Sequence, residues 1–153
     1  MAKEIERKFL LSGSIPVPEG FSKSEIKQGY ILAEKGKQVR VRIAKGKGLL
    51  CVKFTDGVLR DEFEYEIPVK DAKEIFSKCT ATLEKKRLSF KIDKETYDVD
   101  TYPNGLTFVE VEFKSMKDLE KWEKPSWIGE EISGKKKYSN IELAKENLKF
   151  KHV

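Results

Sequence analysis

Histidine and cysteine are scarce in this sequence, in which His152 is the only histidine and Cys51 and Cys79 are the only cysteines. A single histidine close to the end of the chain argues against a histidine-based catalytic triad and against a zinc site. Two cysteines without metal-ligand spacing are expected to be small buried apolar residues. A chain without a disulfide framework is typical of a reducing cytoplasm, which is the expected location.

Long apolar runs and a charge surplus of one sign are also lacking. No run approaches the roughly 20 apolar residues of a membrane-spanning helix. Charged residues begin at Lys3, where a signal peptide would need an apolar segment to follow, so neither export nor a membrane partner is expected. The chain has 31 basic and 26 acidic residues and a net charge of +5. Simple nucleic-acid binders have a larger one-signed surplus beside exposed aromatics, so no nucleic-acid partner is expected.

Charge of both signs is abundant, since 37% of the residues are charged against roughly 25% in an average domain. Charged residues recur at every second position inside strand-like runs. Successive side chains of a β-strand point to opposite faces, so each run has one charged face and one largely apolar face. These runs are Glu4-x-Glu6-x-Lys8, Arg40-x-Arg42, Glu64-x-Glu66, Lys85-x-Arg87, Asp98-x-Asp100 and Glu110-x-Glu112.

The alternation of charged and apolar residues, interrupted by turn residues, predicts one domain over residues 1–153, of the α+β class and mainly β. Tight turns such as Lys45–Gly48 and Thr55–Gly57 indicate antiparallel neighbours. The expected strands cover residues 3–11, 25–33, 38–44, 49–54, 59–68, 81–92, 96–102 and 106–113. The expected helices cover residues 71–78, 115–122 and 139–148, and residues 124–134 are expected to be irregular. Eight antiparallel strands can form a closed barrel, here with a charged interior and about three helices packed outside.

In such a barrel the apolar faces would point outward, beneath the helices. The residues concerned are Val39, Val41, Ile43, Phe63, Tyr65, Val109, Val111 and Phe113. The charged faces would line the interior, where unpaired charges would cost more than the whole stability of a domain. They must therefore pair, stay hydrated and bind a ligand. The alternative is a ladder of salt bridges on an open sheet, which fits any single run but not acidic and basic rows segregated by strand.

Opposite charges in one channel indicate a particular class of ligand. Clustered arginine and lysine bind polyanions, and the planar guanidinium suits phosphate. Carboxylates would repel a phosphate chain unless a hard cation such as Mg²⁺ or Mn²⁺ lay between them. A small polyanion with a divalent cation satisfies both sets of charges.

An ordered set of motifs resembles the CYTH superfamily, the triphosphate tunnel metalloenzymes. It begins with the Glu-x-Glu-x-Lys signature at Glu4-Ile5-Glu6-Arg7-Lys8 and runs from the first strand to the last helix. The other matching segments are Gln28-Gly29-Tyr30, Arg40-Val41-Arg42, Lys53, Glu64-Tyr65-Glu66-Ile67, Lys85-Lys86-Arg87, Val109-Glu110-Val111-Glu112-Phe113, Trp127-Ile128-Gly129-Glu130-Glu131 and Tyr138-Ser139-Asn140. The resemblance implies an eight-stranded antiparallel tunnel, a divalent metal and a triphosphate substrate. One departure is that Lys135 and Lys137 stand where relatives often have an acid and an arginine.

The resemblance also implies roles for individual residues. As metal ligands it implies Glu4, Glu6, Glu110 and Glu112, with Asp100 as a helper. As bases that hold the phosphates it implies Lys8, Arg40, Arg42, Lys53, Lys85 and Arg87. Catalysis would involve Lys8, Glu64 and Glu66, where the two glutamates either bind a second metal or orient the attacking water.

The activity implied is metal-dependent hydrolysis of a triphosphate, first of all inorganic tripolyphosphate to pyrophosphate and phosphate. Alternatives on the same fold are a class IV-type adenylyl cyclase and a thiamine- or nucleoside-triphosphatase. A non-catalytic polyphosphate- or nucleotide-binding module could dispense with the acidic rows that this chain retains. The oligomeric state is open from sequence, with a homodimer as one alternative.

Overall fold

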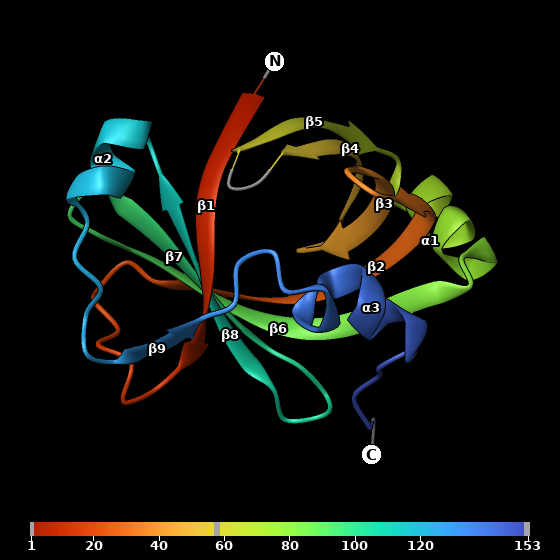
Figure 1. Cartoon of the computed structure of the whole chain (residues 1–153). Coiled ribbons are helices and arrows are strands. Elements are labelled where there is room, and N and C mark those ends of the chain that lie inside the picture. Colours follow the sequence, from red (N-terminus) through yellow and green to blue (C-terminus); the bar gives the residue numbers. More distant parts are fainter. Residues whose placement is uncertain (1, 57–58, 152–153) are drawn as a thin grey trace.

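The structure of the protein is a computed structural model that describes residues 2–56 and 59–151 (Figure 1). Gly57 of the expected turn and His152 lie outside the described residues. The strands are β1 (Ala2–Leu11), β2 (Ser22–Glu34), β3 (Lys37–Ala44), β4 (Lys47–Asp56), β5 (Leu59–Ile67), β6 (Ala81–Ile92), β7 (Glu95–Thr101), β8 (Thr107–Phe113) and β9 (Ile128–Glu131). The helices are α1 (Val69–Lys78), α2 (Met116–Lys121) and α3 (Asn140–Lys145), with a 3₁₀ turn η1 (Lys136–Tyr138) before α3.

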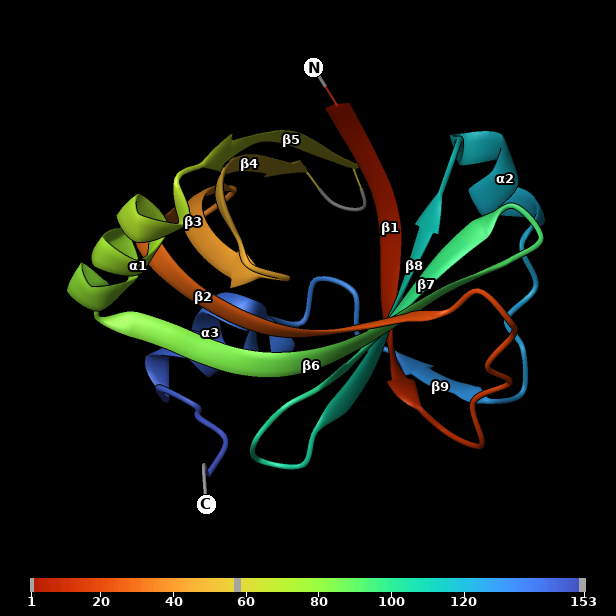
Figure 2. The ribbon, with the colours of Figure 1, turned by 180° about the vertical axis from the view of Figure 1, so that it is seen from behind.

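The strands form a closed antiparallel barrel (Figures 1 and 2). Their order is β5-β4-β3-β2-β6-β7-β8-β1, and pairing of β5 with β1 completes the ring. The predicted eight-stranded barrel is therefore confirmed. The short strand β9 adds to β1 beside the C-terminal half of that strand, where Leu11 pairs with Ile128. Its presence corrects the expectation that residues 124–134 are irregular.

Helix α1 covers the outer face of β3 and β4, as the apolar alternation of those strands predicts. The contact is close because β4 has Gly48 there, and a Cβ on Gly48 would lie 2.5 Å from the Cβ of Ala72. Val41, beneath the helix, is fully buried. Figure 1 shows α1 alongside β2 to β4 and not over β5. Tyr65 of β5 is accordingly 61% exposed, so the expectation that a helix covers it is wrong.

An aromatic core lies outside the other half of the barrel. Val109, Val111 and Phe113 of β8 are buried in it, as predicted from their alternation. Trp122 packs on Phe113 with ring centroids 5.5 Å apart, and its indole nitrogen donates to Tyr97 Oη at 2.9 Å. The tryptophans that follow β8 thus cover the barrel wall that α1 does not reach.

A second apolar cluster lies where α3 packs against the barrel. It contains Tyr102 and Phe108 from the barrel and Leu143 and Ala144 from α3. Ser139 caps the start of α3, because its Oγ accepts a hydrogen bond from the backbone nitrogen of Glu142 at 3.3 Å. We call this cluster, whose members are Tyr30, Leu83, Tyr102, Phe108, Ile132, Leu143 and Ala144, the apolar plug.

Helix α3 is shorter than predicted, since it ends at Lys145 and not near residue 148. Asn147 has a φ of 51°, the left-handed conformation with which helices commonly end. Leu148 then forms a parallel bridge to Leu83 of β6, so tertiary contact replaces the last turn. Among the described residues no helix is both long and apolar enough to cross a bilayer.

Candidate functional site

Strand register places the acidic rows of β1 and β8 side by side inside the barrel. Glu6 lies directly opposite Glu112, with Glu110 two residues before it on the same face of β8. On the other edge of β1, Glu4 lies opposite Arg60 of β5. Opposed residues in an antiparallel pair point to the same face, so residues distant in sequence meet in one interior cluster.

A cavity of about 50 Å³, which we call the inner cavity, lies where these rows meet. The expected site residues that line it are Glu4, Glu6, Arg40, Arg42, Lys53, Lys85, Arg87, Glu110 and Glu112. The inner cavity is also lined by three residues that were not among the expected site residues, namely Arg60, Glu62 and Asn140. Arg60 and Glu62 continue the alternation of Glu64 and Glu66 toward the start of β5, so extending that pattern by two steps would have found them.

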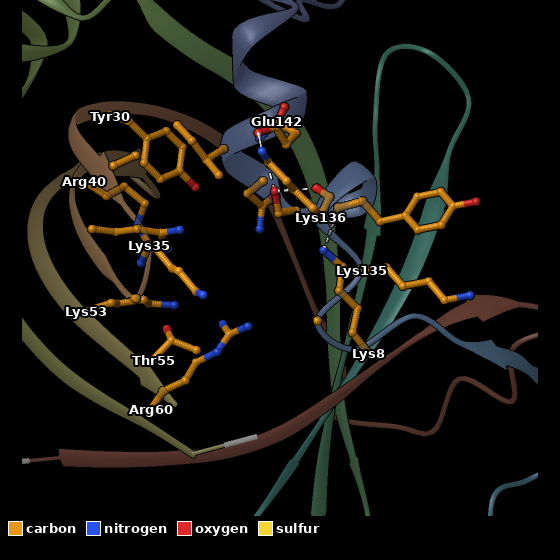
Figure 3. A pocket seen from close by; sticks show the side chains of 18 of the residues that line it. Lys8, Tyr30, Lys35, Arg40, Lys53, Thr55, Arg60, Lys135, Lys136 and Glu142 are labelled. Atoms are coloured by element: carbon orange, nitrogen blue, oxygen red, sulfur yellow. Dashed lines mark hydrogen bonds and ion pairs between the residues drawn. The ribbon is translucent and has the colours of Figure 1, made fainter. Parts of the chain in front are cut away.

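A larger cavity of about 590 Å³, the outer cavity, adjoins the first and shares Arg40, Lys53, Arg60, Glu110 and Asn140 with it. Figure 3 shows Arg40, Lys53 and Arg60 on one wall, with Lys8 on the opposite wall. Lys8 Nζ donates to the carbonyl oxygen of Tyr138 at 2.7 Å. An anion in the outer cavity therefore has bases on two sides.

Two arginines of the site each have a buried donor without a hydrogen-bond partner among the described residues. Arg40 is only 4% exposed, yet its Nε has no hydrogen-bond partner among the described residues. The Nε of Arg60 is likewise buried and has no hydrogen-bond partner in the described part of the chain. An unused buried donor costs about 1–3 kcal/mol, and more for a charged group, so these guanidiniums favour an anionic ligand.

Arg42 is held in place by a neutral side chain. Its Nε and Nη2 both donate to Gln28 Oε1, at 3.2 and 2.9 Å. Gln28 in turn donates from Nε2 to Tyr30 Oη at 2.9 Å. Burial lowers the pKa of Arg42 to about 10, and the neighbouring charge of Arg40 acts in the same direction.

The carboxylates of β1 are buried close to other carboxylates, although Lys53 Nζ lies 3.6 Å from Glu4 Oε2 and Arg60 Nη1 lies 2.6 Å from Glu6 Oε1. Burial, followed by the contact with Glu62, raises the pKa of Glu4 to about 8. Burial and the charge of Glu110 raise the pKa of Glu6 to about 7. Glu4 Oε2 is buried without a hydrogen-bond partner in the described part of the chain. This set of oxygen donors fits a hard divalent cation, which would offset the crowding of the carboxylates.

Glu110 and Glu112, which adjoin these residues, differ from each other. Burial would raise the pKa of Glu110, but the charges of Lys8 and Lys85 outweigh it and hold that pKa well below its ordinary value. Burial raises the pKa of Glu112, as does the charge of Asp98. Lys8 and Lys85 thus favour the charged form of Glu110 within the acidic cluster.

Asp100 is occupied by two bases. Lys85 Nζ lies 2.7 Å from its Oδ2, and Arg87 donates to both of its oxygens at 2.8 and 2.9 Å. Burial opposes ionisation, but the charges of Lys85 and Arg87 lower the pKa of Asp100 to about 2. Asp98, and not Asp100, lines the inner cavity. Asp100 therefore holds the bases in position, an arrangement that disfavours its expected role as a metal helper.

Glu64 and Glu66 lie toward the open end of β5. Glu64 is 38% exposed and 3.9 Å from Arg40 Nη2, whereas Glu66 is 63% exposed and 3.8 Å from Lys47 Nζ. Neither lines the inner or the outer cavity. The expectation that Glu66 lies in the interior is wrong, because β5 extends past the enclosed part of the barrel.

Cys51 contributes to a group that its sequence spacing did not reveal. Cys51, Glu62 and Glu64 have ligand atoms within 4.8 Å of one another and could hold a metal ion. However, Arg40 Nη2 lies 3.7 Å from Glu62 and already provides a cation there. Cys51 is fully buried, as expected, whereas Cys79 is only half-buried.

Comparison with known proteins identifies the class to which this barrel belongs. Residues 2–147 match the CYTH domain, and the chain is a member of the CYTH domain family. It is 40% identical over 152 residues to an inorganic triphosphatase of Acetivibrio thermocellus, with 95% of each chain covered. It is 30% identical over 148 residues to an inorganic triphosphatase of Nitrosomonas europaea, covering 92% of this chain and 96% of the relative. A crystal structure of an inorganic triphosphatase superposes with a TM-score of 0.67 at 28% identity, covering 95% of this chain and 96% of that one.

Proposed function

We propose that this protein hydrolyses inorganic tripolyphosphate to pyrophosphate and phosphate with the help of Mg²⁺ or Mn²⁺. The observation that carries the proposal is the meeting of two groups in one cavity: the buried Nε donors of Arg40 and Arg60, which have no hydrogen-bond partner among the described residues, and the crowded carboxylates of Glu4 and Glu6, whose pKa values are raised. A polyphosphate–cation complex satisfies both. Two relatives that cover almost the whole chain are named inorganic triphosphatases, which supports the same activity.

The bases of the barrel would hold the phosphate chain. Arg40 and Arg42 from β3 and Lys53 from β4 meet Lys85 and Arg87 from β6 around the inner cavity. Lys8 adds a charge from the opposite wall of the outer cavity. Preorganised charges of this kind align the chain and stabilise the negative charge that develops on the phosphoryl oxygens.

The acidic cluster would hold the divalent cation. Its ligands would be Glu4, Glu6, Glu110 and Glu112, whose oxygens are the donor type that Mg²⁺ and Mn²⁺ prefer. When bound, such a cation acts as a Lewis acid toward phosphoryl oxygens. Glu62, or Glu64 beside it, would orient the attacking water as a hydrogen-bond acceptor. Asp100 would contribute indirectly, because it holds Lys85 and Arg87 in position.

We further propose a cytoplasmic location and a small polyanion as the ligand, in place of a nucleic acid or a membrane. The buried Cys51 thiol is consistent with a reducing compartment. The charged walls suit a phosphate chain better than a neutral ligand.

Product analysis tests the proposal. The purified protein is incubated with Mg²⁺ or Mn²⁺ and, in turn, tripolyphosphate, ATP or thiamine triphosphate, and the products are separated by ion-exchange chromatography. Equimolar phosphate and pyrophosphate from tripolyphosphate, formed fastest of the three reactions, is the expected result. Cyclic AMP from ATP would identify a cyclase, and preferential cleavage of an organic triphosphate would replace the proposed substrate. Tight binding without any product would identify a binding module.

A further inference from the structure

Asn140 connects the C-terminal helix to the interior of the barrel. It is the first residue of α3, and it lines both the inner and the outer cavity. Its Oδ1 accepts hydrogen bonds from Tyr102 Oη at 2.5 Å and from Lys85 Nζ at 3.4 Å. Because a lysine ammonium only donates, the amide oxygen and not the amide nitrogen must face Lys85.

Lys85 is the most enclosed base of the site, with a fully buried side chain. Its Nζ lies 2.7 Å from Asp100 Oδ2 and 3.4 Å from Asn140 Oδ1. An ammonium group has three donors, so these two contacts, within the described part of the chain, leave one for a ligand in the inner cavity. Asp100 alone would draw the ammonium toward itself, since it carries the opposite charge. The neutral oxygen of Asn140 provides a second, differently placed acceptor that fixes the direction of Nζ.

The same segment holds a second lysine of the site. The carbonyl oxygen of Tyr138, two residues before Asn140, accepts from Lys8 Nζ at 2.7 Å. Leu143 and Ala144, on the next turn, are buried in the apolar plug. Packing of α3 thus sets the positions of two acceptors for ammonium groups that come from β1 and β6.

We propose that Asn140 is a positioning residue that directs Lys85 toward a phosphate group of the substrate. Through it, the seating of α3 in the apolar plug is coupled to the phosphate-binding geometry of the barrel. The inference rests on the proposed function in so far as the ligand is a polyphosphate.

A double-mutant cycle of Asn140→Ala and Lys85→Met tests this role. Asn140→Ala should lower kcat/KM for tripolyphosphate by about tenfold or more, because a misdirected binding group is costly. If Asn140 acts through Lys85, the double variant should lie within about twofold of Lys85→Met, since the two losses are not independent. The same cycle is measured by calorimetry as the Kd of tripolyphosphate without divalent cations, which reports binding separately from turnover.

Tyr102→Phe is the matched structural control. It removes the other hydrogen bond to Asn140 and leaves the acceptor for Lys85, so kcat/KM should stay within about threefold of the wild type. The melting temperatures of all variants show how much each change destabilises the plug.

Three results would overturn the inference. The first is a double variant whose loss of kcat/KM is the product of the two single losses. The second is an Asn140→Ala variant whose activity and affinity stay within twofold of the wild type, and the third is a loss of kcat/KM in Tyr102→Phe equal to that in Asn140→Ala. The proposed function fails separately. If the wild type binds tripolyphosphate without cleaving it, and the Kd values of the cycle are non-additive, the positioning role of Asn140 stands and the hydrolase activity is ruled out. A wild type that does not bind tripolyphosphate at all would overturn both.

Discussion

Arg60 Nη1 lies 2.6 Å from Glu6 Oε1, so a guanidinium from β5 forms an ion pair with one of the proposed cation ligands on β1. A divalent cation that binds at Glu6 must share this carboxylate with Arg60 or displace it. The ion pair also joins the two strands whose pairing completes the barrel. Cation binding and the position of Arg60 are therefore linked.

Arg60→Gln should tighten cation binding and weaken substrate binding. Removing a positive charge beside Glu6 lowers the electrostatic cost of adding another, so the Kd for Mn²⁺ without substrate should fall by about three- to tenfold. The Kd for tripolyphosphate should rise. Calorimetric titration measures both, with Lys47→Gln on the exposed part of β4 as the control. Unchanged Mn²⁺ affinity would show that Arg60 does not compete with the cation.

Glu6→Gln and Glu110→Gln should each abolish metal-dependent turnover while the fold is retained. Both carboxylates line the inner cavity, and loss of one anionic ligand should lower kcat by about 100-fold or more. Phosphate release over a range of Mg²⁺ and Mn²⁺ concentrations measures the effect, and circular dichroism verifies the fold. Glu130→Gln, at an exposed site paired with Lys135, is the control. Undiminished turnover in both variants would contradict the proposed ligand set.

Arg40→Ala should lower kcat/KM for tripolyphosphate by about 10- to 100-fold. A hydrogen bond to a charged group contributes about 1.5–3 kcal/mol, and each 1.4 kcal/mol corresponds to a factor of ten. Steady-state kinetics measure the effect, and Lys137→Ala, outside both cavities, should retain wild-type kinetics. An unchanged kcat/KM in Arg40→Ala would remove Arg40 from the phosphate-binding set.

Neutralising Glu62 and neutralising Glu66, both on β5, should have different effects on kcat. Glu62 lies 3.7 Å from Arg40 and 3.9 Å from Lys53 and lines the inner cavity, so Glu62→Gln should reduce kcat by about tenfold or more. Glu66→Gln, a chemically identical change at an exposed position, should leave kcat within about twofold. Steady-state kinetic assays of the two variants, run in parallel, compare their kcat values. A larger loss for Glu66 would restore it to the catalytic group.

Without divalent cations, thermal stability should fall as the pH rises from about 5 to 7. Burial raises the pKa values of Glu4 and Glu6 to about 8 and about 7, so the folded protein retains protons that the unfolded chain releases in this range. Above about pH 7 the trend should weaken, because burial lowers the pKa of Lys85 to about 7 and its neutral form then favours the folded state. Melting temperatures measured with a chelator present should fall by a few degrees.

Glu4→Gln tests the origin of this trend, since it should flatten the decline between about pH 5 and 7. Addition of Mg²⁺ at about pH 8 should raise the melting temperature, because the cation binds the deprotonated carboxylates of the folded state. A melting temperature that rises steadily over the same pH range would contradict the assignment of raised pKa values to Glu4 and Glu6.

The alternation of charged and apolar residues was enough to determine the faces of the strands, and with them the barrel. Side-chain direction depends only on the period of two, so Val41 and Val111 could be assigned to the outside and Glu6 and Arg40 to the inside without knowing which strands pair. The serine caps of α2 and α3 are equally local, since the hydroxyl reaches an amide three residues ahead.

Tertiary structure decided how far along each strand the interior extends, and which charges meet there. Glu66 has the same alternation as Glu62 but lies beyond the enclosed part of the barrel, because the extent of the interior depends on register with strands distant in sequence. Asp98 and Asp100 cannot be told apart by pattern, and only the tertiary contacts with Lys85 and Arg87 show that the charge of Asp100 is already neutralised. The sequence by itself therefore determined the faces, while long-range packing determined the partners.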